Sequence, residues 1–378
     1  MPSETILTNA RIVLDDEILG GTVVLRDTLI ADFAAGNSAA GEDMDGDYLV
    51  PGLVELHTDH LESHYSPRPG VVWDSIAALQ AHDAQVAASG ITTVFDCLRL
   101  GSDADGGYKR GEMRAIADAI ETAQAEDRLR ASHLIHLRCE VSAGDVLDHF
   151  EDFRDDPQVR LASLMDHAPG QRQFQTLDAY ILYYKTKRGF GDAEFERFIQ
   201  RRIDESNRNA APHRKAIVEA CTERGIALAS HDDATIEHVE ESRAFGVSLA
   251  EFPTSLEAAT ASHAAGMAVL MGAPNIVRGT SHSGNISAKA LADTGVLDVL
   301  SSDYVPFSLI HAPFVLSDET SMTLPQSIRL VTATPAAAVG LNDRGRIAMG
   351  LRADLVRVRR TSGVPVVRSV WREGRRVA

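Results

Sequence analysis

The chain has 378 residues, which is enough to bury a large hydrophobic core. Its 37 Lys and Arg residues and 54 Asp and Glu residues leave a net charge of −17, and such a molecule repels nucleic acid and anionic membrane surfaces. Hydrophobic residues at 44% and charged residues at 24% exclude a disordered or fibrous protein. We therefore expect a globular protein with a large buried core.

The cysteines and the apolar runs indicate the cellular location of the protein. Cys97, Cys139 and Cys221 lie far apart and form no CxxC pair, which is typical of reduced thiols in a cytoplasmic protein. The N-terminus lacks a basic segment followed by an apolar one, and no apolar stretch reaches the ~18 residues of a membrane span. We expect a cytoplasmic location and no membrane partner, and we leave a homo-oligomer open.

The two ends of the chain share a strand pattern. Residues 1–50 alternate apolar and polar positions in short runs broken by Gly and Asp, and the same pattern returns over residues 346–378. The two ends flank a middle of different rhythm. We expect one small β-sandwich domain built from residues 1–50 and 346–378.

The middle of the chain, residues 51–345, alternates apolar runs with helix-like stretches such as 74–90 and 111–128. Near-continuous apolar runs of this kind suit parallel strands buried on both faces. Eight of them occur, at 49–57, 91–100, 132–140, 159–167, 225–232, 246–253, 266–274 and 295–303. Eight β/α units predict a (β/α)8 TIM barrel, an α/β fold. An open doubly wound sheet is the alternative, but no GxGxxG follows the first strand.

One connection is unusually long. Residues 168–212 separate the fourth and fifth strands and include an aromatic, basic stretch with Lys185, Lys187 and Arg188. We expect this segment to be either an ordinary helical insertion or a lid that closes over a substrate.

Imidazoles and carboxylates gather where the predicted strands end. The active sites of barrels lie at these C-terminal ends. The residues are His57, Asp59, Glu140, His167, His231 and Asp303. His57 and Asp59 are two positions apart, so in an extended strand both side chains point to the same side. A single strand-end histidine is usually structural, but the set predicts a site for Zn, Mn or Fe.

Several of these strings resemble the amidohydrolase superfamily, whose members combine a barrel with a small β domain from both termini. The first strand carries PGLVELHTD, and MDHAPGQRQF and GAPNIVRG are more specific strings. Within the superfamily, the strings from Leu49 to Trp371 resemble the triphosphate diphosphatases of the carbon–phosphorus lyase pathway. The resemblance implies a metal-dependent hydrolase of phosphonate degradation that releases pyrophosphate from a ribosyl 5-triphosphate and leaves the 5-phosphate.

Two positions depart from the superfamily pattern. The first strand has His-x-Asp where most members have His-x-His, which makes one ligand anionic. No lysine ends the fourth strand, so the carbamylated lysine that bridges two metals in many members is not available. Glu140 is the natural substitute for that bridge.

These residues suffice for a mechanism. Two divalent cations (Zn, Mn or Fe) held by His57, Asp59, Glu140, His167 and His231 would lower the pKa of a bound water and polarise a phosphoryl oxygen. Asp303, at the end of the eighth strand, is expected to orient that water and accept its proton, and to be a metal ligand as well.

A triphosphate brings about four negative charges, so cations must reverse the field of this acidic protein inside the cleft. Candidates for substrate binding are Arg278, Arg172, Asn275, His282 and Arg138, together with Arg99, Ser281, Ser283 and the amides of Gly279 and Gly284. Arg278 is the strongest of them, because the stretch 275–284 could cradle phosphate before a helix.

Other readings remain. A C–N hydrolase, either a cyclic amidase or a deaminase, is the alternative that the superfamily favours, and a barrel without catalysis is a third. His60 and His64 read as solvated loop histidines, with a role towards substrate as the alternative. The stretch 103–107 resembles half a calcium loop but reads as a turn. No GxSxG elbow supports a serine hydrolase.

Overall fold

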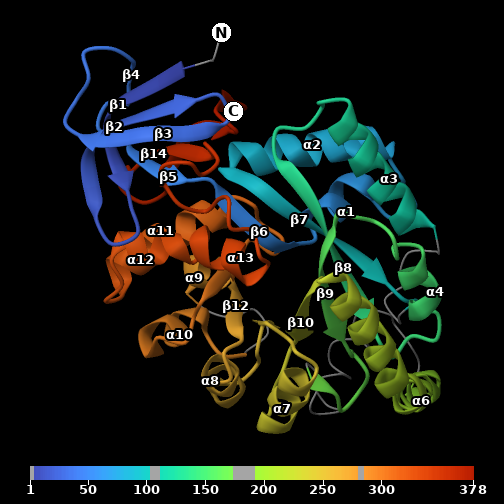
Figure 1. Cartoon of the computed structure of the whole chain (residues 1–378). Helices are drawn as coiled ribbons and strands as arrows, with labels where there is room; N and C mark the ends of the chain where they lie inside the picture. Colours follow the sequence, from blue (N-terminus) through green and yellow to red (C-terminus); the bar gives the residue numbers. More distant parts are fainter. Residues whose placement is uncertain (1–3, 103–110, 173–191, 280–284) are drawn as a thin grey trace. The chain divides into compact units, whose positions relative to one another are not determined.

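The computed structural model describes residues 4–102, 111–172, 192–279 and 285–378 (Figure 1). Its internal contacts divide the chain into two compact units. Unit 1 comprises Met1–Asp96, Ala119–Leu134 and Met271–Ala378, and unit 2 comprises Cys97–Asp118 and Ile135–Leu270.

The two ends of the chain form one sheet within unit 1. Its strands are β1 (Glu4–Val13), β2 (Ile18–Arg26), β3 (Leu29–Ala35), β4 (Glu42–Asp43), β5 (Tyr48–Pro51), β14 (Leu355–Arg359), β15 (Val366–Arg372) and β16 (Arg375–Arg376). They run in the order β16-β15-β14-β5-β1-β2-β3, with β4 paired to β1. β14 is antiparallel to β5, so strands from opposite ends of the sequence lie side by side (Figure 1). The two termini therefore build one sheet, as expected of the small β domain predicted from both ends of the chain.

Alternating side chains of these strands build a core on one side of the sheet. Leu7 and Ile12 of β1, Leu25 of β2, Leu355 of β14 and Trp371 of β15 are at most 2% exposed. Strand side chains alternate between the two faces, and Arg11, which precedes Ile12 on β1, is exposed.

The middle of the chain forms an eight-stranded parallel sheet. Its strands are β6 (Leu53–Thr58), β7 (Ile91–Leu100), β8 (Ser132–Glu140), β9 (Val159–Met165), β10 (Ala227–His231), β11 (Leu249–Glu251), β12 (Ala268–Gly272) and β13 (Val299–Ser301). They follow one another in sequence order from β6 to β13. Within unit 1, a parallel bridge between Thr58 and Asp303 joins the end of β6 to the residues after β13. All eight predicted strands are confirmed, and the sheet is a nearly closed TIM-like barrel.

Helices follow most of these strands. They are α1 (His60–Tyr65), α2 (Ser75–Ala88), α3 (Glu112–Ala125), α4 (Val146–Glu151), α6 (Asp192–Arg224), α7 (Ile236–Ala244), α8 (Leu256–Ala264), α9 (Ala273–Arg278), α10 (Ala288–Thr294), α11 (Ser308–Glu319), α12 (Leu324–Arg329) and α13 (Ala333–Ala338). Side-chain caps begin several of them: Asp74 accepts a hydrogen bond from the amide of Ala77, and Thr323 and Gln326 form a capping box.

The helical part of the long connection continues beyond residue 212. α6 runs through Pro212 and ends only at Arg224, just before β10. In the part of the chain that the structure describes, no helix is both long and apolar enough to span a membrane.

Candidate functional site

In unit 1, the structure brings His57 and Asp303 together. The amide of Asp303 donates to the His57 carbonyl (3.1 Å), and the Thr58 hydroxyl donates to the Asp303 carbonyl (2.9 Å). His57 is 1% exposed, at the end of β6. Asp303 has φ 55°, a left-handed conformation that aspartate tolerates better than most residues. Two predicted site residues 246 positions apart in the sequence thus share one short stretch of backbone hydrogen bonds.

The side chain of Glu55 hydrogen-bonds to His57 and to residues next to Asp303. Its buried carboxylate accepts from the His57 amide (2.6 Å), the Ser301 hydroxyl (2.7 Å) and the Ser302 amide (2.5 Å). Burial raises the pKa of Glu55 above its ordinary value, although these hydrogen bonds act in the other direction. Glu55 is a positioning residue that sequence analysis missed. Its signal was a glutamate inside an otherwise apolar strand.

Asp59 reaches the site in a way that the sequence did not predict. β6 ends at Thr58, and Asp59 is the N-cap of α1 with φ −91° and ψ 8°, so the alternation of an extended strand no longer applies to it. The amide of Asp59 instead donates to the Asp303 carbonyl (3.2 Å). The expectation that His57 and Asp59 are neighbours of one extended strand is therefore wrong. Both nevertheless make backbone hydrogen bonds to Asp303.

Asn275 and Asp303 both approach Gly272 at the end of β12. A Cβ atom added to Gly272 would be in ordinary van der Waals contact, at 3.8 Å, with both Asn275 Nδ2 and Asp303 Oδ2. Arg278 ends α9 and is exposed. Both predicted substrate-binding residues therefore follow β12 on the helix that begins next to Asp303.

In unit 2, Glu140 and His167 form a buried pair. Glu140 ends β8 and is fully buried, and its Oε2 lies 2.7 Å from His167 Nδ1. Arg202 of α6 approaches the other carboxylate oxygen at 3.6 Å, and the Ser142 hydroxyl donates to it. Burial opposes ionisation, but His167 and Arg202 together bring the pKa of Glu140 down to about 2. The long connection thus supplies a cation that supports a predicted ligand.

Three further acceptors gather around the ends of β10 and β11. His231 Nε2 lies 3.5 Å from Asp232 Oδ2, and His231 Nδ1 lies 3.2 Å from Glu251 Oε2. The hydroxyl of Ser163 donates to the same Glu251 oxygen (2.7 Å). Burial lowers the pKa of His231, and the guanidinium of Arg138 adds to that effect, so the imidazole is neutral near pH 7.

The donor set of unit 2 fits a divalent transition metal. One ligand atom from each of His167, His231 and Asp232 lies within 4.8 Å of the others. Two imidazoles and a carboxylate are ligands that Zn, Mn and Fe share. Sequence analysis predicted His167 and His231 but not Asp232 or Glu251. Both acids directly follow or end a strand, which was the available signal.

The predicted arginines divide into two groups. Arg138 is two positions before Glu140 on β8, and its positive charge opposes protonation of His231. The charge of Arg99 likewise opposes protonation of His167. Arg172, by contrast, is 4% exposed and already paired with Asp233 and with Glu241 (2.8 Å). It also lines a cavity of about 410 Å3 with Arg214 and His238.

Some predicted residues lie outside the described part of the chain. These are Ser281, His282, Ser283 and Gly284 of the expected phosphate cradle, Lys185, Lys187 and Arg188 of the expected lid, and the stretch 103–107.

The interpretation of His60 and His64 as solvated loop histidines is wrong. Both lie on α1 and are half-buried, with ring centroids 4.8 Å apart. His60 Nδ1 lies 3.2 Å from the buried His82 of α2. The sequence could not show this, because a helix turns both imidazoles towards a partner 18 or more positions away.

The chain was compared with known proteins. The model of the amidohydrolase family matches residues 74–378. Alpha-D-ribose 1-methylphosphonate 5-triphosphate diphosphatase of Escherichia coli (strain K12) is 46% identical over 376 residues, covering 98% of this chain and 100% of that protein.

Solved structures share the fold. A Xaa-Pro dipeptidase crystallised with bound methionine matches 98% of this chain and 99% of its own, with a TM-score of 0.67 and 15% identity. N-isopropylammelide isopropylaminohydrolase from Burkholderia multivorans matches 99% and 98%, with a TM-score of 0.64 and 15% identity.

Proposed function

Because the chain belongs to the amidohydrolase family, we propose that it is a metal-dependent phosphoric anhydride hydrolase. Its substrate is α-D-ribose 1-methylphosphonate 5-triphosphate, from which it releases pyrophosphate and leaves the 5-phosphate, in phosphonate degradation. The observation that carries the proposal is the 46% identity to the diphosphatase over 98% of this chain and the whole of that protein. The matched region spans the strand ends as well as the rest of the barrel.

Both units supply ligands for two divalent cations (Zn, Mn or Fe). Unit 1 supplies His57, Asp59 and Asp303, and unit 2 supplies Glu140, His167, His231 and Asp232. Each set lies at the C-terminal ends of barrel strands, where the active sites of barrels lie. When bound, such cations supply activation of water and polarisation of a phosphoryl oxygen.

The side chains themselves bind, orient and move a proton. A carboxylate oxygen of Asp303 accepts a hydrogen bond from the attacking water. It takes up the proton of that water as the water oxygen bonds to phosphorus. The bond that breaks is the anhydride between the α- and β-phosphates, because pyrophosphate leaves and one phosphate stays on the ribose. Glu55 keeps Asp303 in register with His57 through Ser301 and Ser302.

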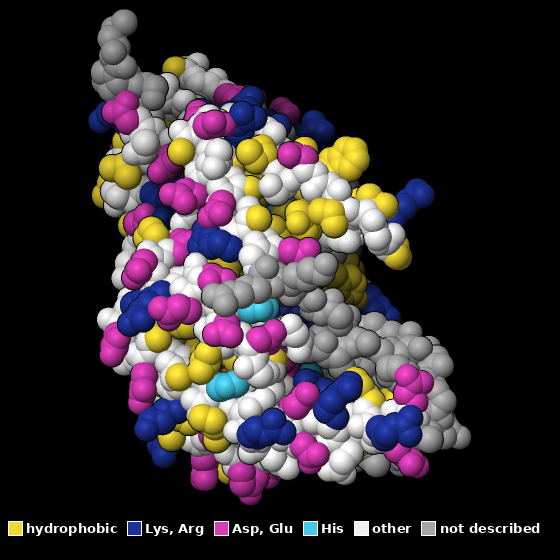
Figure 2. All heavy atoms as spheres, turned by 90° about the vertical axis from the view of Figure 1, so that its right-hand side faces the viewer, with side chains coloured by type: hydrophobic (Ala, Val, Ile, Leu, Met, Phe, Trp, Pro, Cys, Tyr) yellow, Lys and Arg dark blue, Asp and Glu magenta, His cyan; other side chains and the backbone are white. Residues whose placement is uncertain are grey.

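Substrate charge is met by arginines at the strand ends. Arg138 and Arg99 lie near the two imidazoles of unit 2, and Arg278 and Asn275 follow β12 in unit 1. On the face drawn in Figure 2, basic and acidic side chains of the described residues are interspersed. Recognition of an anion therefore depends on these local guanidinium groups, which pair with phosphate through two parallel hydrogen bonds.

A substrate panel tests the proposal. Purified protein supplied with Zn2+ or Mn2+ is offered the ribosyl triphosphate, a cyclic amide and an aminopurine, and pyrophosphate, ring-opened product and ammonia are measured separately. Pyrophosphate release should exceed the other activities by orders of magnitude. Ammonia or ring-opened product without pyrophosphate would show instead that the protein is a C–N hydrolase, the alternative that family membership by itself favours.

A further inference from the structure

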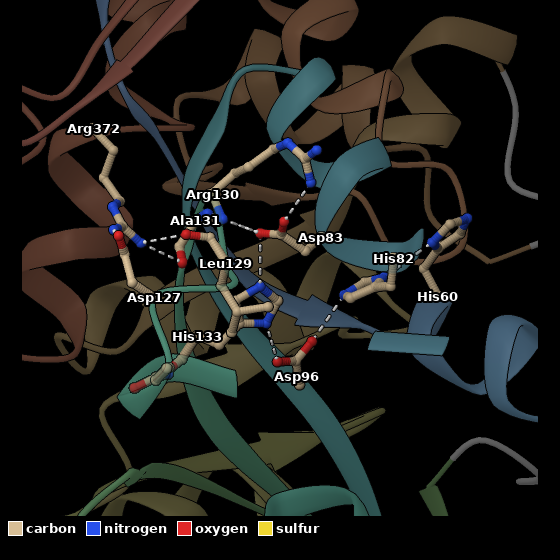
Figure 3. A network of polar contacts seen from close by, with 11 residues as sticks. His60, His82, Asp83, Asp96, Asp127, Leu129, Arg130, Ala131, His133 and Arg372 are labelled. Carbon is tan, nitrogen blue, oxygen red and sulfur yellow. Dashed lines mark hydrogen bonds and ion pairs between the residues drawn. The ribbon is translucent and has the colours of Figure 1, made fainter. Parts of the chain in front are cut away.

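A second group of histidines lies in unit 1, apart from the strand-end ligands. It comprises His60 and His64 on α1 and His82 on α2, and one ligand nitrogen from each lies within 4.8 Å of the others. Figure 3 shows His60 and His82 facing each other at one end of a row of polar side chains. That row continues from His82 through Asp96 of β7 to His133 and Asp83.

The row determines which nitrogen of His82 carries a proton. His82 Nε2 lies 2.9 Å from Asp96 Oδ1, and both groups are fully buried. Burial alone would raise the pKa of Asp96, but His133 and His82 hold it well below the usual range, so the carboxylate is ionised and accepts only. His82 therefore donates from Nε2. Its Nδ1 then presents a lone pair towards His60 and His64.

This arrangement is typical of a metal-ligating histidine. Such residues usually donate the other ring N–H to a carboxylate, which orients the ring and makes the ligand more basic. Asp96 is itself oriented, because its Oδ2 lies 2.7 Å from His133 Nδ1. Asp83 supports His133 at 3.3 Å and accepts from the amides of Arg130 (2.8 Å) and Ala131 (2.9 Å).

The spacing of the imidazoles fits a single ion. His60 Nδ1 and His82 Nδ1 are 3.2 Å apart. Two nitrogens bound at ~2.05 Å with a tetrahedral angle would be separated by ~3.3 Å. The Nε2 atom of His64 is buried, and the side chain of Gln85 interacts with this imidazole. The His64 ring lies 4.8 Å from that of His60 and 6.1 Å from that of His82.

We propose that His60, His64 and His82 form a separate site for a divalent transition metal of the Zn class, with Asp96 as the carboxylate that orients His82. Three imidazoles without a carboxylate ligand favour Zn, Ni or Cu over Mg, Ca or Mn. The site goes beyond the proposed hydrolase function. It would tie α1, which directly follows His57 and Asp59, to α2, against which α1 packs.

A surface cavity adjoins the cluster at one of its three histidines. Its volume is about 320 Å3, and it is lined by His64 together with Pro67, Trp73 and Ala81, so the His64 side of the cluster faces a cavity at the surface.

The number of zinc ions bound per chain distinguishes a metal site from a simple hydrogen bond between His60 and His82. Full-length protein is stripped with a chelator, titrated with Zn2+, and its bound zinc per chain is measured by native mass spectrometry. Wild type and the matched control His263→Gln, an exposed histidine on α8, should bind one zinc more than His60→Gln and His64→Gln. Equal stoichiometry in all four proteins would overturn the proposal, whatever their activity.

A second measurement needs no substitution and therefore does not depend on whether the variants fold. Wild-type protein is treated with diethylpyrocarbonate with and without Zn2+, and modified histidines are located by peptide mass spectrometry. Zinc should reduce labelling of His64 at least tenfold and leave His263 unchanged. Equal labelling of His64 under both conditions would likewise overturn the site.

Discussion

At the scale of single residues, three positions directly after barrel strands have left-handed backbone. Asp232 follows β10 with φ 58°, Phe252 follows β11 with φ 51°, and Asp303 lies two residues after β13 with φ 55°. Such conformations cost ~1–2 kcal/mol for most residues and persist where the surrounding structure holds them. Two of these three residues, Asp232 and Asp303, are ones that we assign to the site.

Asp303→Asn tests the assignment of Asp303 as the group that accepts a proton. Asparagine keeps the size of the side chain and tolerates the left-handed backbone, but its amide does not accept a proton at neutral pH. We expect kcat for pyrophosphate release to fall by ~10²–10⁴-fold. Asp293→Asn, an exposed residue on α10, serves as the matched control and should keep its activity.

The metal content of both proteins should be measured in the same samples. An Asp303→Asn protein that turns over at the wild-type rate would exclude Asp303 as the base. A variant that has lost both metal and activity would show that Asp303 serves mainly as a ligand.

At the scale of elements, one carboxylate joins the two ends of the chain. Asp47, just before β5, is 5% exposed and accepts from Arg357 Nε (2.7 Å) and Arg359 Nε (2.8 Å) of β14. Burial opposes ionisation, but these hydrogen bonds hold the pKa of Asp47 below its ordinary value. The sheet that combines N-terminal and C-terminal strands is therefore fastened electrostatically as well as by its core.

Asp47→Asn should lower the free energy of unfolding by about 1–2 kcal/mol at pH 7, because two charge-assisted hydrogen bonds are lost. The folded pKa is the lower one, so the ionised carboxylate stabilises the fold above the unfolded value of ~3.9. That contribution is lost as the pH falls through the folded pKa. Urea unfolding at pH 7, 5 and 3.5 should show the variant approaching wild type at the lowest pH.

Asp16→Asn provides the control for this series, since Asp16 is exposed between β1 and β2. It should remain close to wild type at each pH. A difference between Asp47→Asn and wild type that stays constant down to pH 3.5 would contradict an ionic origin.

At the scale of the whole molecule, metal binding should couple activity to stability. Glu140 and Asp232 are buried acids at the strand ends, where a cation would bind. A ligand that binds only the folded state and is present at 1,000 times its Kd raises the free energy of unfolding by ~4 kcal/mol. Dialysis against a chelator should therefore abolish pyrophosphate release and lower Tm. Added Zn2+ or Mn2+ should restore both, whereas Na+ should restore neither.

The activity of the chelated protein decides whether the metal is needed for catalysis. Full activity after dialysis, with less than one divalent ion per chain by elemental analysis, would mean that the strand-end histidines and acids serve only the fold.

Local pattern was sufficient for the architecture. Uninterrupted apolar runs identify strands buried on both faces, alternation identifies the sheet from the two termini, and both signals depend on side chains close in sequence. The same reasoning predicted His57, Glu140, His167, His231 and Asp303 as site residues, because barrel active sites lie at the C-terminal ends of strands, and the structure places each of them within two residues of such an end. The strings shared with a known superfamily supplied the reaction.

Contacts between distant segments decided the rest. Asp59 caps a helix because β6 ends exactly at Thr58. Glu55 and Arg172 are held by partners between 61 and 247 positions away, namely the residues beside Asp303 and the carboxylates of Asp233 and Glu241. The cluster of His60, His64 and His82 depends on how α1 packs on α2. Periodicity within one segment shows which face is buried, but only the packed chain shows which groups meet there.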